Sequence, residues 1–302
     1  MPLLLLFACT GEMSNQIFLD DADFLAALPD ESRQTLGFDA DTTDATARGL
    51  GDRADLVDLS VGIASGVNSF VLRTLGVVDA VRELPPSERT EDGRRWGPYE
   101  VDCDVSAAML MSRENGVYGW SVLGHPAAGE DATVLYGTHY AGTTVAGGDG
   151  TFVWDQGRWA EWCGTSETGL MTVDYDNREG VDLFVVVEDW STEGEAPTDW
   201  AYAYRRTSDL GDFQYRTVTD LEADGSDALA TVSVRDRWVP RQGGRSDAWV
   251  TGGGFGATTW TWSQCWGPTG RLVWQGDSQD LLEAVGDAAD CLYSDAAEVD
   301  RL

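Results

Sequence analysis

The chain has 302 residues, of which 52 are acidic and 20 are basic, so its formal net charge at neutral pH is −32. Binding of nucleic acid or of an anionic membrane surface needs a positively charged footprint, and this composition argues against both. A hydrophobic content of 42% is enough for a substantial core, and the length suits one large β-rich domain.

The N-terminus begins with a short apolar run, residues 3–7, that leads into a polar segment. The sequence Leu6-Phe7-Ala8-Cys9 resembles the lipobox of bacterial lipoproteins. The resemblance implies that residues 1–8 are the remainder of a signal segment, and that Cys9 carries a lipid that anchors the protein to a membrane. Thr10 replaces the aspartate that the family uses for inner-membrane retention, which implies a cell-envelope protein of the outer membrane. The alternative is a short buried strand with a free thiol.

The four remaining cysteines are an even number, as expected for two disulfides in an oxidising compartment. Cys265 lies at the end of a predicted strand and Cys291 follows a predicted helix that folds back, so we favour this pair. Cys103 and Cys163 then form the second disulfide, although the sequence alone allows three connectivities. The chain has no C-x-x-C motif and only two histidines, which argues against a zinc site.

Residues 9–51 are acidic and loosely patterned, and we interpret them as a tether between the lipid and the folded domain. Two short helices are predicted within it, at 20–28 before Pro29 and at 30–36 before Gly37.

A long amphipathic helix is predicted over residues 52–84, because apolar residues recur there every three to four positions. Pro85 and Pro86 end it. Gly62, Gly66 and Gly76 are unfavourable inside a helix, which indicates that the backbone of another element approaches closely; chance glycines in a glycine-rich chain are the alternative. Beyond residue 9, no apolar run approaches the ~20 residues of a membrane span.

From residue 95 the apolar pattern changes to the two-residue period of β-strands. Short joins with Asn-Gly, Asp-Gly and Gly-rich sequences make consecutive strands antiparallel neighbours. Residues 182–188 are apolar on both faces, which is typical of a central strand. The predicted strands are 101–113, 117–124, 133–141, 150–154, 170–176, 182–188, 200–207, 213–219, 228–238, 249–252, 258–263 and 271–274.

These elements predict an α+β fold that is mainly antiparallel β, with a large curved sheet or open barrel wrapped around the one long N-terminal helix. The predicted domain covers residues 52–293. It ends with a helix that starts at Asp277 or Ser278 and runs to Val285, and residues 294–302 form a C-terminal tail.

A second resemblance covers residues 75–99, a small part of the chain. Leu84-Pro85-Pro86 and Arg95-Trp96-Gly97-Pro98-Tyr99 are similar to a stretch of uncharacterised myxobacterial-type envelope lipoproteins. The resemblance implies the same address in the cell envelope and no particular activity.

Searches for catalytic motifs identify no nucleophile, phosphate-binding or metalloprotease pattern, so an enzyme is not the favoured class and the catalytic residues stay unknown. No cofactor is predicted, with calcium as the one open alternative. Asp220, Glu222, Asp224 and Asp227 place oxygen ligands at alternate positions, as a calcium loop does, although an acidic hairpin tip explains them better. Asp174, Asp176 and Asn177 are a weaker candidate.

The chain contains 13 tryptophans, and Trp260 and Trp262 are predicted to present neighbouring rings on one face of a strand. Such rings stack on sugars or simply stabilise a sheet. The favoured function is therefore a lipid-anchored envelope protein with a binding or structural role and an unknown protein or glycan partner. The alternatives are a carbohydrate-active enzyme or carbohydrate-binding protein, and a carrier of an apolar ligand in a curved-sheet cavity.

Overall fold

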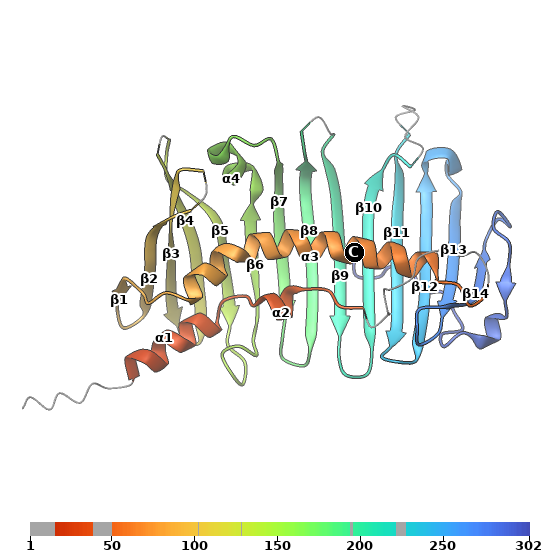
Figure 1. Cartoon of the computed structure of the whole chain (residues 1–302), viewed down its shortest axis with the longest axis horizontal. Helices are drawn as coiled ribbons and strands as arrows, with labels where there is room; N and C mark the ends of the chain where they lie inside the picture. Colours follow the sequence, from red (N-terminus) through yellow and green to blue (C-terminus); the bar gives the residue numbers. More distant parts are fainter. Residues whose placement is uncertain (1–15, 39–49, 102, 128, 194–195, 222–227) are drawn as a thin grey trace, which may run out of the picture.

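The computed structural model describes residues 16–38, 50–101, 103–127, 129–193, 196–221 and 228–302. Within these residues the chain forms one sheet of fifteen antiparallel strands whose spatial order is their order in the sequence (Figure 1). The prediction of a mainly antiparallel β fold is thus confirmed. The strands are β1 Glu88–Arg89, β2 Gly93–Glu100, β3 Val105–Glu114, β4 Val117–Pro126, β5 Ala132–Tyr140, β6 Asp149–Asp155, β7 Thr168–Asp176, β8 Val181–Ser191, β9 Thr198–Arg206, β10 Gly211–Thr219, β11 Ala230–Val239, β12 Gly243–Gly252, β13 Thr259–Trp266, β14 Leu272–Asp277 and β15 Val285–Gly286.

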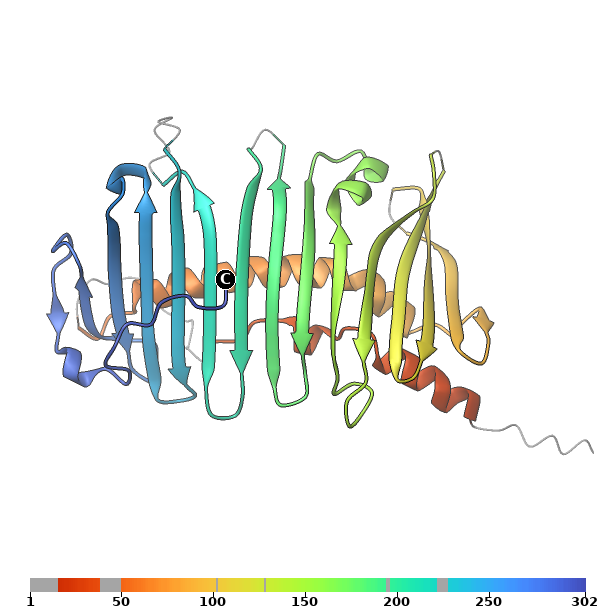
Figure 2. The ribbon, with the colours of Figure 1, turned by 180° about the vertical axis from the view of Figure 1, so that it is seen from behind.

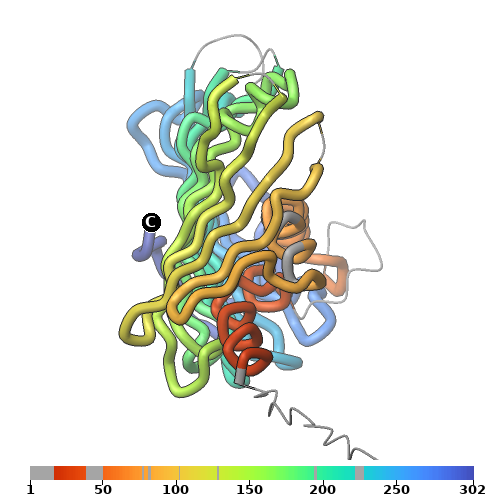
Figure 3. The backbone as a smooth tube through the Cα atoms, turned by 90° about the vertical axis from the view of Figure 1, so that its left-hand side faces the viewer, coloured from red at the N-terminus to blue at the C-terminus, as the bar shows by residue number. Residues whose placement is uncertain are grey.

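Helices cover one face of the sheet, and Figure 3 shows them on one side of a twisted single layer of strands. We call this the helix face and the other the back face. The helices of the described residues are α1 Gln16–Ala26, α2 Glu31–Gln34, α3 Asp55–Arg82 and α4 Gln156–Cys163, with short 3-10 turns η1 Gly253–Phe255 and η2 Ala288–Asp290.

The sheet does not wrap around the helix, so that part of the prediction is wrong. The strand order ends at β1 and β15, which do not pair with each other, and the sheet stays open. The 28 residues of α3 span about 42 Å, whereas fifteen strands span roughly 67 Å. A helix this short cannot serve as the axis of so wide a sheet, and it lies across part of one face instead.

Two further predictions fail for local reasons. The stretch from Asp277 to Val285 is not helical, because Asp280 has a positive φ of 55° that interrupts a right-handed helix. Asp277 nevertheless accepts the amide hydrogens of Gln279, Leu281 and Leu282, so it caps a turn rather than a helix.

The prediction that no segment beyond residue 9 could span a membrane is also wrong by length and composition, since Asp55–Gly76 of α3 meets both criteria. A core helix meets the same criteria.

The lower half of the helix face, below α3 in Figure 1, is covered by α1, α2 and the chain that follows them. Phe24, Leu28 and Leu36 are buried there, although they fall within the predicted tether. Asn68 of α3 exchanges two hydrogen bonds with the main chain of Leu36, at 2.7 and 2.9 Å. Beneath this cover, a row of side chains in register across the strands is buried: Tyr118, His139, Tyr175, Leu183, Tyr204 and Phe213.

The two predicted disulfides are present, with Cα–Cα distances of 4.9 Å for Cys103–Cys163 and 5.4 Å for Cys265–Cys291. The first joins the β2–β3 turn to the end of α4. That turn separates β2 from β3 because Cys103 and Asp104 both have positive φ, whereas the sequence predicted one strand from residue 101. The second disulfide joins β13 to Cys291, which directly follows η2 and precedes the C-terminal tail that crosses the back face in Figure 2.

Candidate functional site

Two hollows lie in line along the side of α3 that faces the upper strand ends, where α4 is found in Figure 1. We call them together the upper groove. Gly62 and Gly66 line the first hollow and Gly76 lines the second. Among the described atoms, a methyl group added to any of these glycines would have no neighbour within 4 Å. The prediction of a close backbone approach is therefore wrong, and the glycines border open space.

Aromatic side chains from the sheet form the opposite wall of the first hollow, which has a volume of about 260 Å³. Trp190 at the end of β8, Trp200 at the start of β9 and Tyr215 on β10 are all half-buried. Phe70 of α3 contacts Trp190 edge to face, with ring centroids 4.8 Å apart. The alternation of strand residues places Trp200 and Tyr215 on the helix face. In the described chain, no helix equivalent to α1 or α2 covers this upper half of the face.

The second hollow, of about 510 Å³, lies beneath α4. Asp155 caps α4 by accepting the amide hydrogen of Arg158 at 2.8 Å, and Gly164 ends the helix with a left-handed conformation. Trp154 and Trp159 line the hollow, as does the Cys103–Cys163 disulfide. The disulfide therefore holds α4 in place as a wall of the groove.

A chain of polar contacts crosses the second hollow. Arg73 of α3 forms an ion pair with Glu167 at 3.3 Å. Glu167 accepts a hydrogen bond of 2.8 Å from Gln156, whose side-chain oxygen accepts one of 2.7 Å from the Trp154 indole. The Arg73 guanidinium also lies 5.7 Å from the ring centroid of Phe70, which lines the first hollow, so these two side chains mark the point where the hollows meet. The groove thus has apolar walls with one charged crossing point.

Trp260 and Trp262 share a face of β13, as predicted, with ring centroids 6.1 Å apart and planes 22° apart. Phe255 of η1 stacks on Trp260 at 5.5 Å. The Trp260 indole donates to Asp277 at 3.0 Å, and Trp262 packs against the small buried cluster that includes Leu56. The pair lies at the far end of the helix face from α4. Both indoles are held by contacts with neighbouring side chains. Stacking on a ligand stays a prediction.

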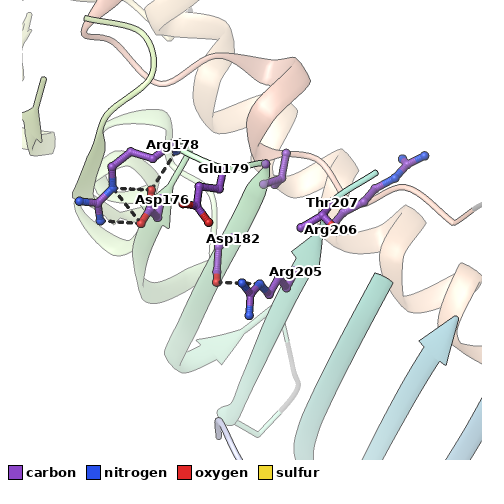
Figure 4. A pocket seen from close by; sticks show the side chains of 9 residues that line it. Asp176, Arg178, Glu179, Asp182, Arg205, Arg206 and Thr207 are labelled. Atoms are coloured by element: carbon purple, nitrogen blue, oxygen red, sulfur yellow. Dashed lines mark hydrogen bonds and ion pairs between the residues drawn. The ribbon is translucent and has the colours of Figure 1, made fainter. Parts of the chain in front are cut away.

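A third hollow, of about 350 Å³, lies at the opposite strand ends, and Figure 4 shows that charged side chains surround it. Arg178 donates to Asp176 at 2.9 Å, and this hydrogen bond lowers the pKa of Asp176. Asp182 lies 3.9 Å from Arg205 and 2.6 Å from Arg301. A carboxyl group whose pKa is lowered is a poor general acid, so Asp176 does not suit that role in glycoside hydrolysis.

Two predicted sites lie wholly or partly outside the described residues. Cys9 precedes residue 16, and Glu222, Asp224 and Asp227 of the predicted calcium loop fall in the gap at 222–227, so only Asp220 is described. Within the described ranges, no group of three or more His, Cys, Asp or Glu side chains is arranged to hold a metal ion. Lipid attachment and calcium binding stay predictions.

His139, the more buried of the two histidines, lies in the lower half of the helix face. His139 is 2% exposed, and its ring nitrogens lie 2.9 Å from the Tyr175 hydroxyl and 2.6 Å from the Val145 carbonyl oxygen. Burial lowers the pKa of His139, which keeps the ring neutral. These contacts suit a structural histidine.

Comparisons of the chain with protein-family models, with curated proteins and with solved structures find no match. The function is therefore inferred from the upper groove and from the N-terminal motif. Sequence reasoning did not identify the groove, but the signals were available: glycines one turn apart on α3, and half-buried tryptophans at the ends of neighbouring strands.

Proposed function

We propose that the chain is a lipid-anchored cell-envelope protein that binds one extended apolar ligand, such as a lipid acyl chain, in the upper groove. The observation that carries the proposal is the open side of α3, where three glycines border hollows whose other walls hold tryptophan and tyrosine. The proposed address depends on the lipobox-like sequence that ends at Cys9.

The sequence of α3 supports an apolar ligand. Charged residues make up 24% of the chain, yet none occurs from Leu59 to Leu72. Only one side of this segment packs on the sheet, and Leu59 is 45% exposed. The other exposed positions of this segment are Gly62, Ser65, Gly66 and Ser69, so the helix presents a surface of small uncharged residues to a ligand.

The size and shape of the groove favour a single extended chain. Small-molecule sites typically occupy about 300–1,000 Å³, which includes the combined volume of the two hollows. The groove follows α3 from Gly62 to Ala80, a rise of about 27 Å for eighteen residues.

The same residues favour binding over hydrolysis. A glycosidase needs two carboxylates beside the substrate, and Glu167 is the one carboxylate among the described residues that line the groove. Its contacts with Arg73 and Gln156 hold it as part of the wall. This arrangement supports a carrier rather than a carbohydrate-active enzyme.

The test uses the full-length protein and a fluorescent fatty acid as the probe. We expect the wild type to bind the probe and Gly66→Leu to lower the affinity at least tenfold, because the new side chain enters the first hollow. Stability should not fall, since Leu is a better helix former than Gly by about 0.8 kcal/mol and meets open space. Ser65→Leu, on an exposed position of α3 that does not line the hollow, is the matched control.

Equal affinity in the wild type and both variants, or no binding by the wild type, would contradict the carrier. The membrane anchor is tested separately, in cells that are given a palmitate analogue. The analogue should label the wild type and should not label Cys9→Ser. Unchanged membrane fractionation of Cys9→Ser would contradict the anchor while leaving the groove experiment intact.

A further inference from the structure

The C-terminal tail, residues 293–302, crosses the back face over β12, β11 and β10 (Figure 2), and the side chain of Arg301 reaches Asp182 at the start of β8. It is held by four arginines that the alternation of strand residues places on this face, Arg216 of β10, Arg235 and Arg237 of β11, and Arg245 of β12. We call these the arginine row. Each of the four donates to a main-chain carbonyl oxygen of the tail.

These hydrogen bonds are made to main-chain atoms of the tail and not to its side chains. Arg245 donates to the carbonyl oxygen of Ser294 at 2.9 Å, and Arg237 donates to that of Asp295. Arg235 and Arg216 donate to the carbonyl oxygens of Glu298 and Leu302 at 2.6 and 2.7 Å. A carbonyl oxygen is present at every residue, so this set of bonds suits any extended segment of similar length.

Buried groups on the sheet accept the amide hydrogens of the tail. The side-chain oxygen of Gln214, which is fully buried, accepts from the amides of Asp300 and Arg301 at 3.0 and 3.1 Å. Asp247, also fully buried, accepts from the amide of Ala297 at 3.4 Å. The sheet therefore offers donors and acceptors in alternation, as an extended peptide requires.

The sheet holds the arginine row in position by contacts of its own. Arg245 pairs with Asp247 at 2.8 Å, and Arg235 pairs with Asp212 at 2.6 Å. The Asp247 carboxylate also accepts a hydrogen bond of 2.6 Å from Ser263. Because these pairs involve sheet residues alone, the row does not need the tail to be assembled.

The tail buries its apolar side chains only in part, because Tyr293, Ala297, Val299 and Leu302 are half-buried and none is fully buried. Ala296, Glu298 and Asp300 are exposed, and Asp300 lies 3.0 Å from Arg235. Its acidic residues match the positive charge of the row in a protein whose net charge is −32. A segment that is attached by hydrogen bonds and charge, with few buried side chains, is exchangeable for another of the same chemistry.

We propose that the arginine row is a binding site for an extended acidic segment of a partner protein, and that the tail occupies this site until the partner displaces it. Recognition would combine main-chain hydrogen bonds with acidic side chains beside the arginines. The tail, present in the same chain at a high effective concentration, sets the affinity that the partner must exceed.

The experiment uses the full chain with a fluorescein-labelled peptide of residues 293–302 as the probe. The double substitution Ala297→Pro with Asp300→Pro removes two of the amide donors and releases the tail, which hydrogen exchange verifies. We expect the peptide to bind this variant at least tenfold more tightly than the wild type, and higher salt to weaken the binding.

Two further comparisons identify the residues responsible. Adding Arg235→Gln and Arg237→Gln to the double variant should lower peptide affinity at least tenfold, whereas Arg158→Gln on α4, at the other face, should leave it unchanged. A peptide with asparagine and glutamine in place of its acidic residues should bind more weakly than the acidic one. Absence of peptide binding after the tail is released, or dimers formed by exchange of tails with no uptake of peptide, would overturn the proposal.

Discussion

Both faces of the sheet carry a covering segment, but α3 and the C-terminal tail are attached by different chemistry. Residues of α3 such as Leu56, Val71 and Leu75 are at most 1% exposed, whereas the tail is held mainly by bonds between side chains of the sheet and its main chain. Apolar burial contributes about 25 cal/mol per Å², so a packed helix adds several kcal/mol to stability. A hydrogen bond contributes about 1 kcal/mol net, and another extended segment can form the same main-chain bonds, so the tail can be replaced by a segment of the same chemistry.

The helix face itself also has two different regions, one on each side of α3. Below α3, residues 16–38 bury Phe24, Leu28 and Leu36 against the sheet, although a hollow of about 440 Å³ remains beside His139 and Tyr175. Above α3, Trp190 and Trp200 stay half-buried beside the upper groove. The covered region has the properties of a stabilising core, and the uncovered region has those of a binding surface.

The largest predicted effect comes from the packed part of the helix face. Trp238 is 1% exposed and stacks on Phe38 with ring centroids 4.9 Å apart. We expect Trp238→Ala to lower the free energy of unfolding by about 4 kcal/mol, because the cavity removes contacts from both the sheet and residues 16–38. Urea denaturation measures the change. Leu281→Ala, at a position that is 59% exposed, is the control and should change stability by less than about 0.5 kcal/mol.

A loss of less than about 1 kcal/mol in Trp238→Ala would show that the covered half is no better packed than the open half, and the comparison between the two halves would fail.

The second prediction concerns Asp236, a carboxyl group beneath α3 that is fully buried. Burial raises the pKa of Asp236 to about 7, the charges of Asp247 and Asp212 act in the same direction, and the hydroxyls of Ser246 and Ser60 oppose them. A folded-state pKa above the unfolded value means that the folded state holds this proton more tightly. Its stabilisation is fully present below about pH 4, decreases as the pH rises toward 7 and is lost above that value.

Asp236→Asn removes this titration. The difference in unfolding free energy between wild type and variant should therefore change by roughly 4 kcal/mol between pH 4 and pH 8, at about 1.4 kcal/mol per unit of pKa shift. Denaturation curves at several pH values measure it, with Asp174→Asn, an exposed carboxylate of the same sheet, as the control. A constant difference across this range would mean that Asp236 does not titrate beneath α3.

The features that the sequence predicted are those with a periodic or covalent signal. The helix expected at 52–84 occurs at Asp55–Arg82, because its apolar spacing and the two prolines are local signals. The apolar run of β8 indicated a central strand, and the spacing of the cysteines favoured the observed disulfides. The burial of Phe24 was missed, since it depends on Tyr118 and Arg94 from distant strands.

The tail contacts were also beyond the reach of the sequence. Arg235 and Arg237 alternate on β11, which does predict two arginines on one face, but their partners are main-chain oxygens about 60 residues away. Main-chain atoms carry no sequence signal, so nothing in residues 293–302 indicates where they lie. The glycines of α3 were recognised and misinterpreted, because a sequence does not distinguish a close neighbour from open space.

The smallest predicted effect concerns the arginine row. Arg216 donates to the Leu302 carbonyl oxygen at 2.7 Å and to the Ser233 hydroxyl at 3.3 Å, and we expect Arg216→Gln to lower the free energy of unfolding by at most about 1 kcal/mol. Hydrogen exchange should accelerate at the amides of Asp300 and Arg301 and stay unchanged in α3, because the two segments are attached to opposite faces. Arg216→Lys, which keeps the charge but changes the donor geometry, should give an intermediate rate. A loss above about 2 kcal/mol, or faster exchange in α3, would show that the tail is part of the cooperative core, and the contrast between the two faces would not hold.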